Sequence, residues 1–223
     1  MKPYYSHAGI QIFHGDCREV LPRLCAQGFD AFVTDPQYGV GENYESGCDD
    51  LTNVDCGLWA LTYLRGTAGT GALTPGVKNM WMYPRPVWIG SFFYPSATGR
   101  GPWGFVCWQP ILYYGTDPYG GTGSRPDSCS STEAAEKNGH PCPKPIGQWK
   151  WLVNRVTLEG QLICDPFMGS GTTLRAAKDL GRRAIGIEIE EKYCEIAAKR
   201  LSQEVLDFST SQIDRAVCRK PMS

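Results

Sequence analysis

Apolar and polar residues alternate in blocks along the first part of the chain. The apolar run Ile10–Phe13 is typical of a short strand, and the run Phe29–Thr34 predicts a second, buried strand. The second run stops at the turn 35–39, which reads Asp-Pro-Gln-Tyr-Gly. Between the two runs lies a helix that Pro22 keeps short. Its apolar face consists of Cys17, Val20, Leu21 and Leu24.

The last third of the chain repeats this alternation more clearly. The apolar runs Gln161–Cys164 and Ala184–Ile187 predict buried strands, and a glycine turn after the first run opens a helix over 172–180. A final helix has an inner stripe made of Tyr193, Ile196, Ala197 and Leu201. Strands and helices that alternate through short links form parallel sheets with right-handed crossovers, so the pattern predicts an α/β fold with a mainly parallel sheet.

The middle of the chain, from about Gly41 to Gly139, has a different composition. It is rich in Gly, Pro, Ser and Thr, with strand candidates at 86–93 and 104–114 and a possible helix at Leu51–Arg65. We predict that Trp88 and Trp108 belong to the core of the same sheet. The segment 116–140 combines Gly, Ser, Pro and charged residues, which indicates a mobile surface loop.

Composition restricts the class of protein more than it names a function. A chain of 223 residues with 42% hydrophobic positions can bury one sizeable core. It has no apolar run of about 18 residues and no signal-peptide layout at its start, so we expect a cytoplasmic protein without a membrane span. Its ten cysteines form no C-x-x-C pair and its histidines have no metal spacing, so we expect reduced thiols and no metal site.

The glycine turn after Asp165 is a candidate nucleoside-cofactor site. Glycines at the tip of a parallel strand let a ligand approach the start of the next helix, and Glu188 at the next strand end is placed to bind ribose hydroxyls. A triphosphate loop would need a Lys after Gly171, and a dinucleotide loop would need a glycine at Leu174. Asp165 would repel a pyrophosphate but attract an ammonium and a sulfonium, which favours S-adenosylmethionine. The alternative is a plain tight connection.

The turn Asp35-Pro36-Gln37-Tyr38 is the second candidate site. The carboxylate of Asp35 and the carbonyl of Pro36 can accept hydrogen bonds from an exocyclic amine, while Tyr38 can stack on the flat base that carries it. Taken alone, such turns are common and usually structural. The site therefore depends on the motifs that accompany it.

Together these motifs resemble the DNA amino-methyltransferases, which methylate the exocyclic nitrogen of adenine or cytosine. The likeness is to their circularly permuted beta group, in which the catalytic turn precedes the cofactor loop. It covers roughly residues 10 to 45 and 139 to 202 and leaves the middle almost unmatched. The matching segments are His14–Cys17, Asp35–Tyr38, His140–Pro145, Phe167–Thr173 and Gly181–Glu188.

The resemblance implies a Rossmann-like methyltransferase fold in permuted order and a role for each matching residue. Asp16 would contact the cofactor adenine, Glu188 its ribose, and Asp165 with Lys144 its methionine end. The loop around the cofactor would consist of Phe167, Gly169, Gly171 and Thr172. The catalytic group would be Asp35, Pro36 and Tyr38, and the reaction a direct methyl transfer from S-adenosylmethionine to a base flipped out of duplex DNA.

Gln37 departs from the family pattern, which usually has a second proline there. The loss of one fixed φ makes the turn less preorganised, so an impaired, DNA-binding subunit is an alternative function. Because the turn begins with Asp35, the family tendency favours adenine over cytosine. Cys142 lacks the setting of the nucleophile used for cytosine carbon methylation, and His140 is expected to be a structural hydrogen-bonding residue.

Residues 1–206 are predicted to form one methyltransferase domain, followed by a tail at 207–223. Segment 41–139 would hold strands of the sheet together with the target-recognition insertion, and the loop 116–139 is our expected DNA contact. Basic residues of this segment are Lys78, Arg85, Arg100 and Arg125, but it also contains Glu42, Glu45, Asp49, Asp50 and Asp55. A recognition region this small implies a homodimer or a short target, and a cognate restriction enzyme is a possible partner.

Overall fold

The computed structural model describes residues 1–38, 43–44, 47–48, 51–96, 99–122, 125–133 and 144–203. The strands are β1 (Tyr5–His7), β2 (Ile10–His14), β3 (Phe29–Thr34), β4 (Asn43–Tyr44), β5 (Gly47–Cys48), β6 (Ala68–Leu73), β7 (Trp88–Phe93), β8 (Gly99–Gly101), β9 (Gly104–Val106), β10 (Trp108–Gly115), β11 (Ser128–Ser130), β12 (Leu162–Asp165) and β13 (Arg183–Glu188). The helices are α1 (Cys17–Leu24), α2 (Leu51–Thr67), α3 (Gly76–Asn79), α4 (Ile146–Val156), α5 (Thr172–Asp179) and α6 (Glu191–Ser202), with a short 3₁₀ turn at Cys25–Gln27.

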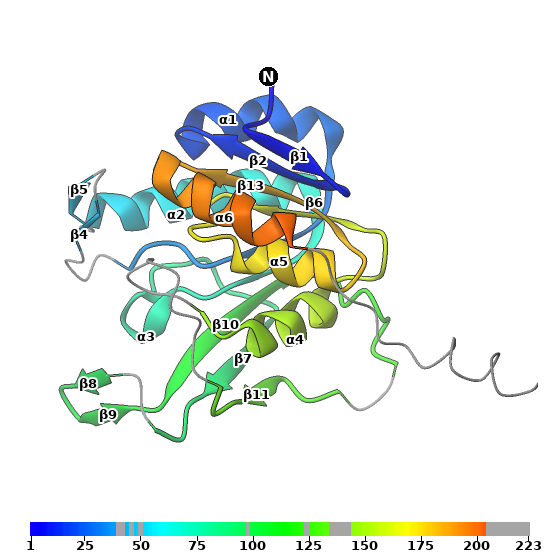
Figure 1. The fold of residues 1–223 in the computed structure, drawn as a ribbon. Helices are drawn as coiled ribbons and strands as arrows, with labels where there is room; N and C mark the ends of the chain where they lie inside the picture. The colour runs from blue at the N-terminus through cyan, green and yellow to red at the C-terminus, as the bar shows by residue number, and fades with distance from the viewer. Residues whose placement is uncertain are drawn as a thin grey trace, which may run out of the picture.

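A nine-stranded sheet forms the centre of the molecule, with the strand order β1-β2-β13-β12-β3-β6-β10-β7-β11. Neighbouring strands from β2 to β6 run parallel, whereas β10 is antiparallel to both β6 and β7. The carboxyl ends of the parallel strands therefore meet at one edge. We call this the carboxyl edge; it includes the segments that follow β3, β6, β12 and β13 (Figure 1).

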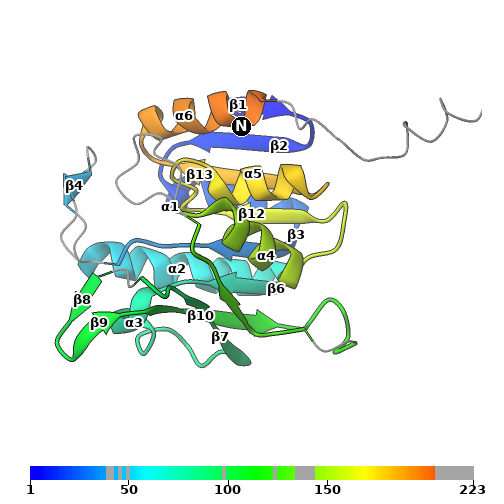
Figure 2. The ribbon, with the colours of Figure 1, turned by 60° about the horizontal axis from the view of Figure 1, so that its bottom comes forward.

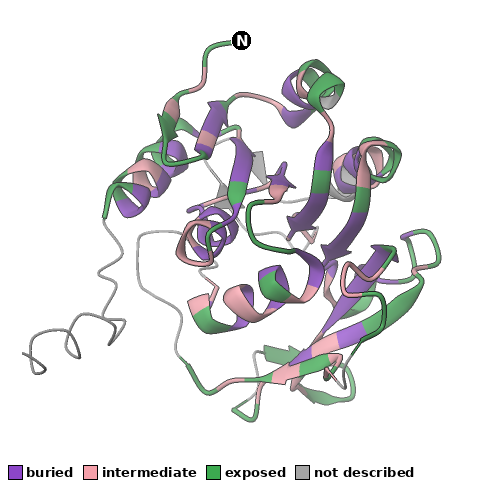
Figure 3. Ribbon diagram, turned by 90° about the vertical axis from the view of Figure 1, so that its right-hand side faces the viewer, coloured by how far each residue is buried: buried purple, intermediate pink, exposed green. Residues whose placement is uncertain are grey.

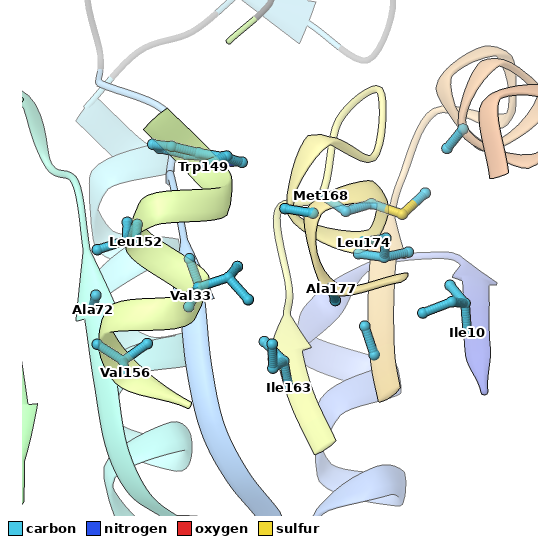
Figure 4. Packing of buried hydrophobic residues seen from close by; sticks show 14 of the residues in the cluster. Ile10, Val33, Ala72, Trp149, Leu152, Val156, Ile163, Met168, Leu174 and Ala177 are labelled. Atoms are coloured by element: carbon cyan, nitrogen blue, oxygen red, sulfur yellow. The ribbon is translucent and has the colours of Figure 1, made fainter. Parts of the chain in front are cut away.

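Helices cover both faces of the sheet, as Figures 1 and 2 show. Alternate residues of a strand point to opposite faces, so neighbouring residues of β3 enter different cores: Val33 packs in the cluster with α4, α5 and α6, and Phe32 in the cluster with α1 and α2. Figure 3 shows the resulting buried band along the strands. In the first cluster, Trp149 and Leu152 of α4 lie over β3 and β6 (Figure 4).

Most of the elements expected from the apolar pattern are confirmed. The strands at 10–13, 29–34, 161–164 and 184–187 and the helices at 17–24, 51–65 and 172–180 are all present with small shifts of their ends. Strand β6 and helix α4 are not among the elements expected from the pattern. The sequence of β6, Ala-Gly-Thr-Gly-Ala-Leu, has little strand character, whereas α4 does carry a helical pattern in Trp149, Leu152, Val153 and Val156.

Two expectations about the middle of the chain are only partly confirmed. Trp88 and Trp108 do lie on strands of the sheet, β7 and β10, but they are not core residues, because they are 60% and 38% exposed. The segment 116–140 is not wholly loop, since β11 pairs in parallel with β7 at the border of the sheet. Within the part of the chain that the structure describes, none of the helices is both long and apolar enough to cross a membrane.

Candidate cofactor and catalytic site

The glycine turn lies where β12 meets α5, and its first residue is a buried carboxyl group. Asp165 is 2% exposed and accepts hydrogen bonds from the Thr34 hydroxyl (2.7 Å) and the Phe167 amide (3.1 Å). Burial raises the pKa of Asp165 to about 6, although a side-chain hydrogen bond from Thr173 lowers it. These donors are neutral, so a ligand that brings a positive charge to this carboxylate would be stabilised there.

Glu188, at the end of β13, connects the glycine turn with the next turn of the chain. Its two carboxylate oxygens accept hydrogen bonds from the amides of Gly169 (3.0 Å) and Glu190 (2.9 Å). Burial raises the pKa of Glu188 to about 7. Its backbone carbonyl accepts a hydrogen bond from Gly15 (2.9 Å), which places the loop after β2 beside it.

Asp16 belongs to this loop and lies beside Glu188, as the predicted site requires. The Arg18 guanidinium binds the Asp16 carboxylate at 2.5 Å and, through this hydrogen bond, lowers its pKa. Asp16, Asp165 and Glu188 thus come together at the carboxyl edge from three parallel strands. Carboxylates that follow neighbouring strands in this way suit the ribose, base and amine of a nucleoside cofactor.

The remaining residues of the predicted cofactor loop have structural partners. Thr172 is buried, and its hydroxyl accepts a hydrogen bond from Arg200 of α6 (3.0 Å). Gly171 has a φ of +77°, and a Cβ placed on it would lie 2.8 Å from the Cβ of Ala197. Only glycine therefore lets the turn pack this closely on α6. Phe167 is half-buried, and the turn that it begins leads directly into α5.

The Asp-Pro-Gln-Tyr turn follows β3 at the same edge, one strand away from the glycine turn. Asp35 accepts a hydrogen bond from the Tyr38 hydroxyl (2.5 Å) and forms an ion pair with Lys144 (2.7 Å). Burial, followed by the charge of Asp35, raises the pKa of Tyr38 well above its usual value. Pro36 is buried against Gly57 of α2, where a Cβ would lie 3.1 Å from the proline Cβ. The turn is therefore held against α2 through Pro36.

Lys144 contacts the catalytic turn directly. Its ammonium also lies 3.5 Å from the Tyr38 hydroxyl and 5.3 Å from the centre of the Tyr38 ring. The preceding residues of the predicted element, with His140 and Cys142, lie outside the described residues, as do Glu42, Glu45, Asp49 and Asp50. Lys144 and Asp165 are connected through the chain, since Asp35, which pairs with Lys144, directly follows Thr34, which binds Asp165.

The sequence analysis missed two side chains that hold Asp35. Thr74, just after β6, donates to its carboxylate (2.5 Å), and Gln109 at the start of β10 donates to the same oxygen (3.3 Å). Gln109 also donates to the Tyr38 hydroxyl. The sequence holds only a weak signal for Thr74, because Ala72-Leu73 followed by Thr-Pro-Gly resembles the end of the run at Thr34-Asp35-Pro36. Gln109 gives no such signal, since it lies inside an otherwise ordinary strand.

The candidate cofactor residues and the Asp-Pro-Gln-Tyr turn are connected by hydrogen bonds. Thr34 links them: its hydroxyl donates to Asp165 and its carbonyl accepts from the Thr74 amide (3.1 Å). The carboxyls of Asp165 and Glu188 are buried and bonded only to neutral donors among the contacts described above. They suit the cationic groups and the hydroxyl groups of S-adenosylmethionine, respectively. Fold and site together define a Rossmann-like, S-adenosylmethionine-dependent methyltransferase.

Comparison with known proteins supports this class and narrows it. The sequence profile of a DNA methylase family, designated N6/N4, matches residues 73–199, more than half of the chain. The type II methyltransferase M.ScaI of Streptomyces caespitosus is 26% identical over 257 residues, covering 91% of this chain and 84% of the relative. The chain therefore belongs to the N6/N4 DNA methylase family and is a DNA methyltransferase.

Solved structures show the same fold. M1.HpyAVI in complex with S-adenosylmethionine has a TM-score of 0.66 and 21% identity, with 87% of this chain and 100% of that chain covered. The cytosine-N4-specific PvuII DNA methyltransferase has a TM-score of 0.68 and 15% identity, with 96% of this chain and 93% of that chain covered. These likenesses establish the Rossmann-like architecture.

Proposed function

We propose that the protein methylates the exocyclic amine of adenine in duplex DNA. The catalytic residues would be Asp35, Pro36 and Tyr38. The observation that carries this proposal is the position of Asp35, one residue from Thr34, which binds the buried Asp165 at 2.7 Å. An amine bound to Asp35 would lie beside a methyl donor whose ammonium is held at Asp165. Adjacent binding of both reactants is the main source of rate in a direct transfer.

The residues of the turn have distinct tasks in this reaction. S-adenosylmethionine supplies an electrophilic methyl group on a sulfonium. The Asp35 carboxylate and the Pro36 carbonyl accept hydrogen bonds from the amine, which orients the nitrogen lone pair towards that methyl. As the N–C bond forms and the C–S bond breaks, the nitrogen loses a proton through Asp35 to water. Tyr38 stacks on the base.

The cofactor side of the proposed site consists, besides Asp165, of Asp16, Lys144, Phe167, Gly169, Gly171, Thr172 and Glu188. Glu188 would bind the ribose hydroxyls and Asp16 the adenine. The proposal for Lys144 includes a second task, because its ion pair with Asp35 fixes the carboxylate that the amine must meet. Each of these residues lies on or beside a turn at the carboxyl edge.

The choice of adenine rests on the turn beginning with Asp35, which is the tendency of adenine enzymes in the family that the chain resembles. Cytosine-N4 methylation uses the same geometry and is the alternative.

A permuted chain order accounts for the contact of α6 with β2: in an unpermuted relative, α6 would lead into that strand. A homodimer and a cognate restriction enzyme complete the proposed set of partners.

The test is product analysis with a matched variant. Purified protein is incubated with unmethylated duplex DNA and labelled S-adenosylmethionine, and the digested nucleosides are identified by mass spectrometry. We expect 6-methyladenine, and we expect Asp35→Asn to lower the rate by about 100-fold or more, because an amide oxygen is a weaker acceptor for the amine than a carboxylate. The variant also loses the ion pair with Lys144, so its cofactor affinity is measured alongside, and we expect that affinity to fall far less than the rate. Formation of 4-methylcytosine would show that the target base is cytosine instead of adenine. Cofactor binding without transfer to any DNA would favour the impaired DNA-binding subunit, with Gln37 as the lesion.

A further inference from the structure

The β8–β9 hairpin, residues 99–106, extends from the carboxyl edge of the sheet. Trp108 of β10 pairs with Phe93 of β7, and Leu112 pairs with Leu73, the last residue of β6. The hairpin between β7 and β10 therefore emerges at the edge where the catalytic turn lies. Figures 1 and 2 both show it on the same side as α3 and β4.

The tip of this hairpin exposes aromatic side chains to solvent. Trp103 lies in the two-residue turn between β8 and β9 and is 101% exposed, and Phe105 is 76% exposed. Arg100 pairs with Phe105 across the hairpin, and neighbouring cross-strand residues share one face. Large aromatic side chains left fully exposed on a small hairpin indicate a binding surface, since their exposure otherwise only costs free energy.

The charge pattern around the hairpin favours nucleic acid as the partner. From Cys56 to Thr116 the chain contains no Asp or Glu. Arg100 lies on the hairpin itself, and Lys78 lies on α3, which follows β6 at the same edge. Aromatic side chains beside cations, without acidic neighbours in the sequence, are suited to phosphate contact and base stacking. The acidic residues of the middle segment all precede this stretch or follow it.

The loop 116–139, our expected DNA contact, is not placed for that task in its first part. Gly115 pairs with Thr70 near the start of β6, so β10 delivers the chain to the opposite edge of the sheet. There Asp117 forms ion pairs with Arg125 (2.8 Å) and Arg155 (3.4 Å). These residues are bonded to α4 at the edge opposite Asp35, which argues against a DNA contact beside the target base in this first part of the loop.

The base of the hairpin is joined to the catalytic turn by a short series of hydrogen bonds. The Tyr94 amide donates to the Cys107 carbonyl (2.7 Å), which closes the hairpin, and the Tyr94 hydroxyl lies 3.4 Å from the Gln109 side-chain oxygen. Gln109 in turn binds Asp35. Trp103 precedes Val106 by three positions, so the tip lies about 10 Å beyond this base, within the width of a DNA groove.

We propose that the β8–β9 hairpin is a DNA-contacting element whose Trp103 enters the base stack beside the displaced target base, while Arg100 contacts a phosphate. This inference rests on the proposed function, because a base reaches Asp35 only after it leaves the duplex. An aromatic wedge that fills the vacated space offsets part of the cost of unstacking.

The test measures DNA affinity and needs no knowledge of the recognition sequence. A labelled duplex of mixed sequence is compared with the same duplex carrying one abasic site, which mimics the gap, in the presence of S-adenosylhomocysteine. We expect the protein to bind the abasic duplex about tenfold more tightly, and Trp103→Ala to remove this preference. Arg100→Ala should weaken binding to both duplexes equally and reduce the salt dependence.

Trp88→Ala is the matched control, because Trp88 is an exposed tryptophan at the opposite end of β7. It should keep the preference, and all variants should keep the cofactor affinity and melting temperature of the natural chain. Trp103→Ala protein that retains the abasic preference overturns the proposal even if methyl transfer is found. A Trp103-dependent preference without any methyl transfer supports the hairpin and contradicts only the catalytic proposal. A stable dimer that Trp103→Ala dissociates would overturn it as well, because the tip would then be a dimer contact.

Discussion

At the scale of single residues, the Asp35 carboxylate is fully engaged by the protein itself. Tyr38, Thr74 and Gln109 all donate to one oxygen, and Lys144 binds the other. An incoming amine must share the oxygen that Lys144 binds or displace one of these donors, so the network sets both the position of Asp35 and the cost of substrate entry. Gln109 is the positioning residue that connects Asp35 with Tyr38.

Replacement of Gln109 by Met should lower kcat about tenfold, because a small displacement of the turn misaligns the amine with the methyl group. Steady-state kinetics on unmethylated DNA measure the effect, and KM for S-adenosylmethionine should not change. Tyr94→Phe is the control: it removes a hydroxyl from the other end of the Gln109 amide and should change kcat less than twofold. Equal effects of the two variants would contradict a positioning role.

The buried carboxyls make the stability of the ligand-free protein depend on pH. Burial raises the pKa of Asp165 to about 6 and that of Glu188 to about 7. Between the unfolded and folded pKa values the native state binds more protons, so the free energy of unfolding should fall as pH rises from about 4 to 7, by on the order of 3 kcal/mol per carboxyl.

Urea unfolding from pH 4.5 to 8 tests this dependence. Asp165→Asn and Glu188→Gln should each flatten the curve, because the amide cannot ionise. At pH 8 each variant should be more stable than the natural chain without ligand, yet bind S-adenosylmethionine at least tenfold more weakly. A variant curve parallel to that of the natural chain would show that the carboxyl concerned does not titrate in this range.

At the scale of elements, the glycine turn determines how α5 and α6 meet. Its backbone passes so close to Ala197 that a side chain at 171 cannot fit. Arg200 of α6 reaches back to Thr172 at the start of α5. The glycine turn therefore also fixes the packing of α5 against α6, and we expect its residues to contribute to both stability and cofactor binding.

Gly171→Ala should lower the free energy of unfolding by about 1 to 3 kcal/mol, since it forces a positive φ and a close contact on alanine. The matched control is Gly66→Ala in α2, where a Cβ would meet nothing within 4 Å. That variant should be more stable by up to about 1 kcal/mol, because alanine favours the helix. Chemical unfolding of both proteins decides the point, and similar losses of stability would contradict the packing argument.

At the scale of the whole molecule, the parallel sheet gathers distant segments at one edge. The turns after β2, β3, β6, β12 and β13 and the hairpin between β7 and β10 all lie there. The opposite edge carries the ion pairs of Asp117. A ligand bound at the carboxyl edge thus contacts several elements at once.

Cofactor binding should therefore stabilise the fold as one cooperative unit. At a concentration 100 times its Kd, S-adenosylmethionine should raise the free energy of unfolding by about 2.7 kcal/mol. Thermal or urea unfolding at increasing cofactor concentration measures the gain. Glu188→Gln should show a smaller gain at the same concentration, whereas Trp88→Ala should show the full one. Separate transitions for the two halves of the chain would contradict a single unit.

Much of the fold and the cofactor site could be predicted from local sequence. The strand runs that end at Thr34 and Cys164, and the glycine turn after Asp165, are short-range patterns in which composition and turn chemistry agree. The acidic residue at the next strand end, Glu188, follows from the same βαβ pattern. For this reason local sequence is sufficient to predict the class of ligand.

Only the tertiary structure decided which side chains surround Asp35 and where the middle of the chain lies. Thr74 and Gln109 reach Asp35 from β6 and β10, and no local pattern specifies which strands become neighbours. The antiparallel register of β10 places its start at the carboxyl edge and its end at the other, which moved the candidate DNA contact from the loop after β10 to the hairpin before it. Burial, too, is a property of the assembled sheet: Trp88 is as apolar as a core residue, but the described residues leave it 60% exposed.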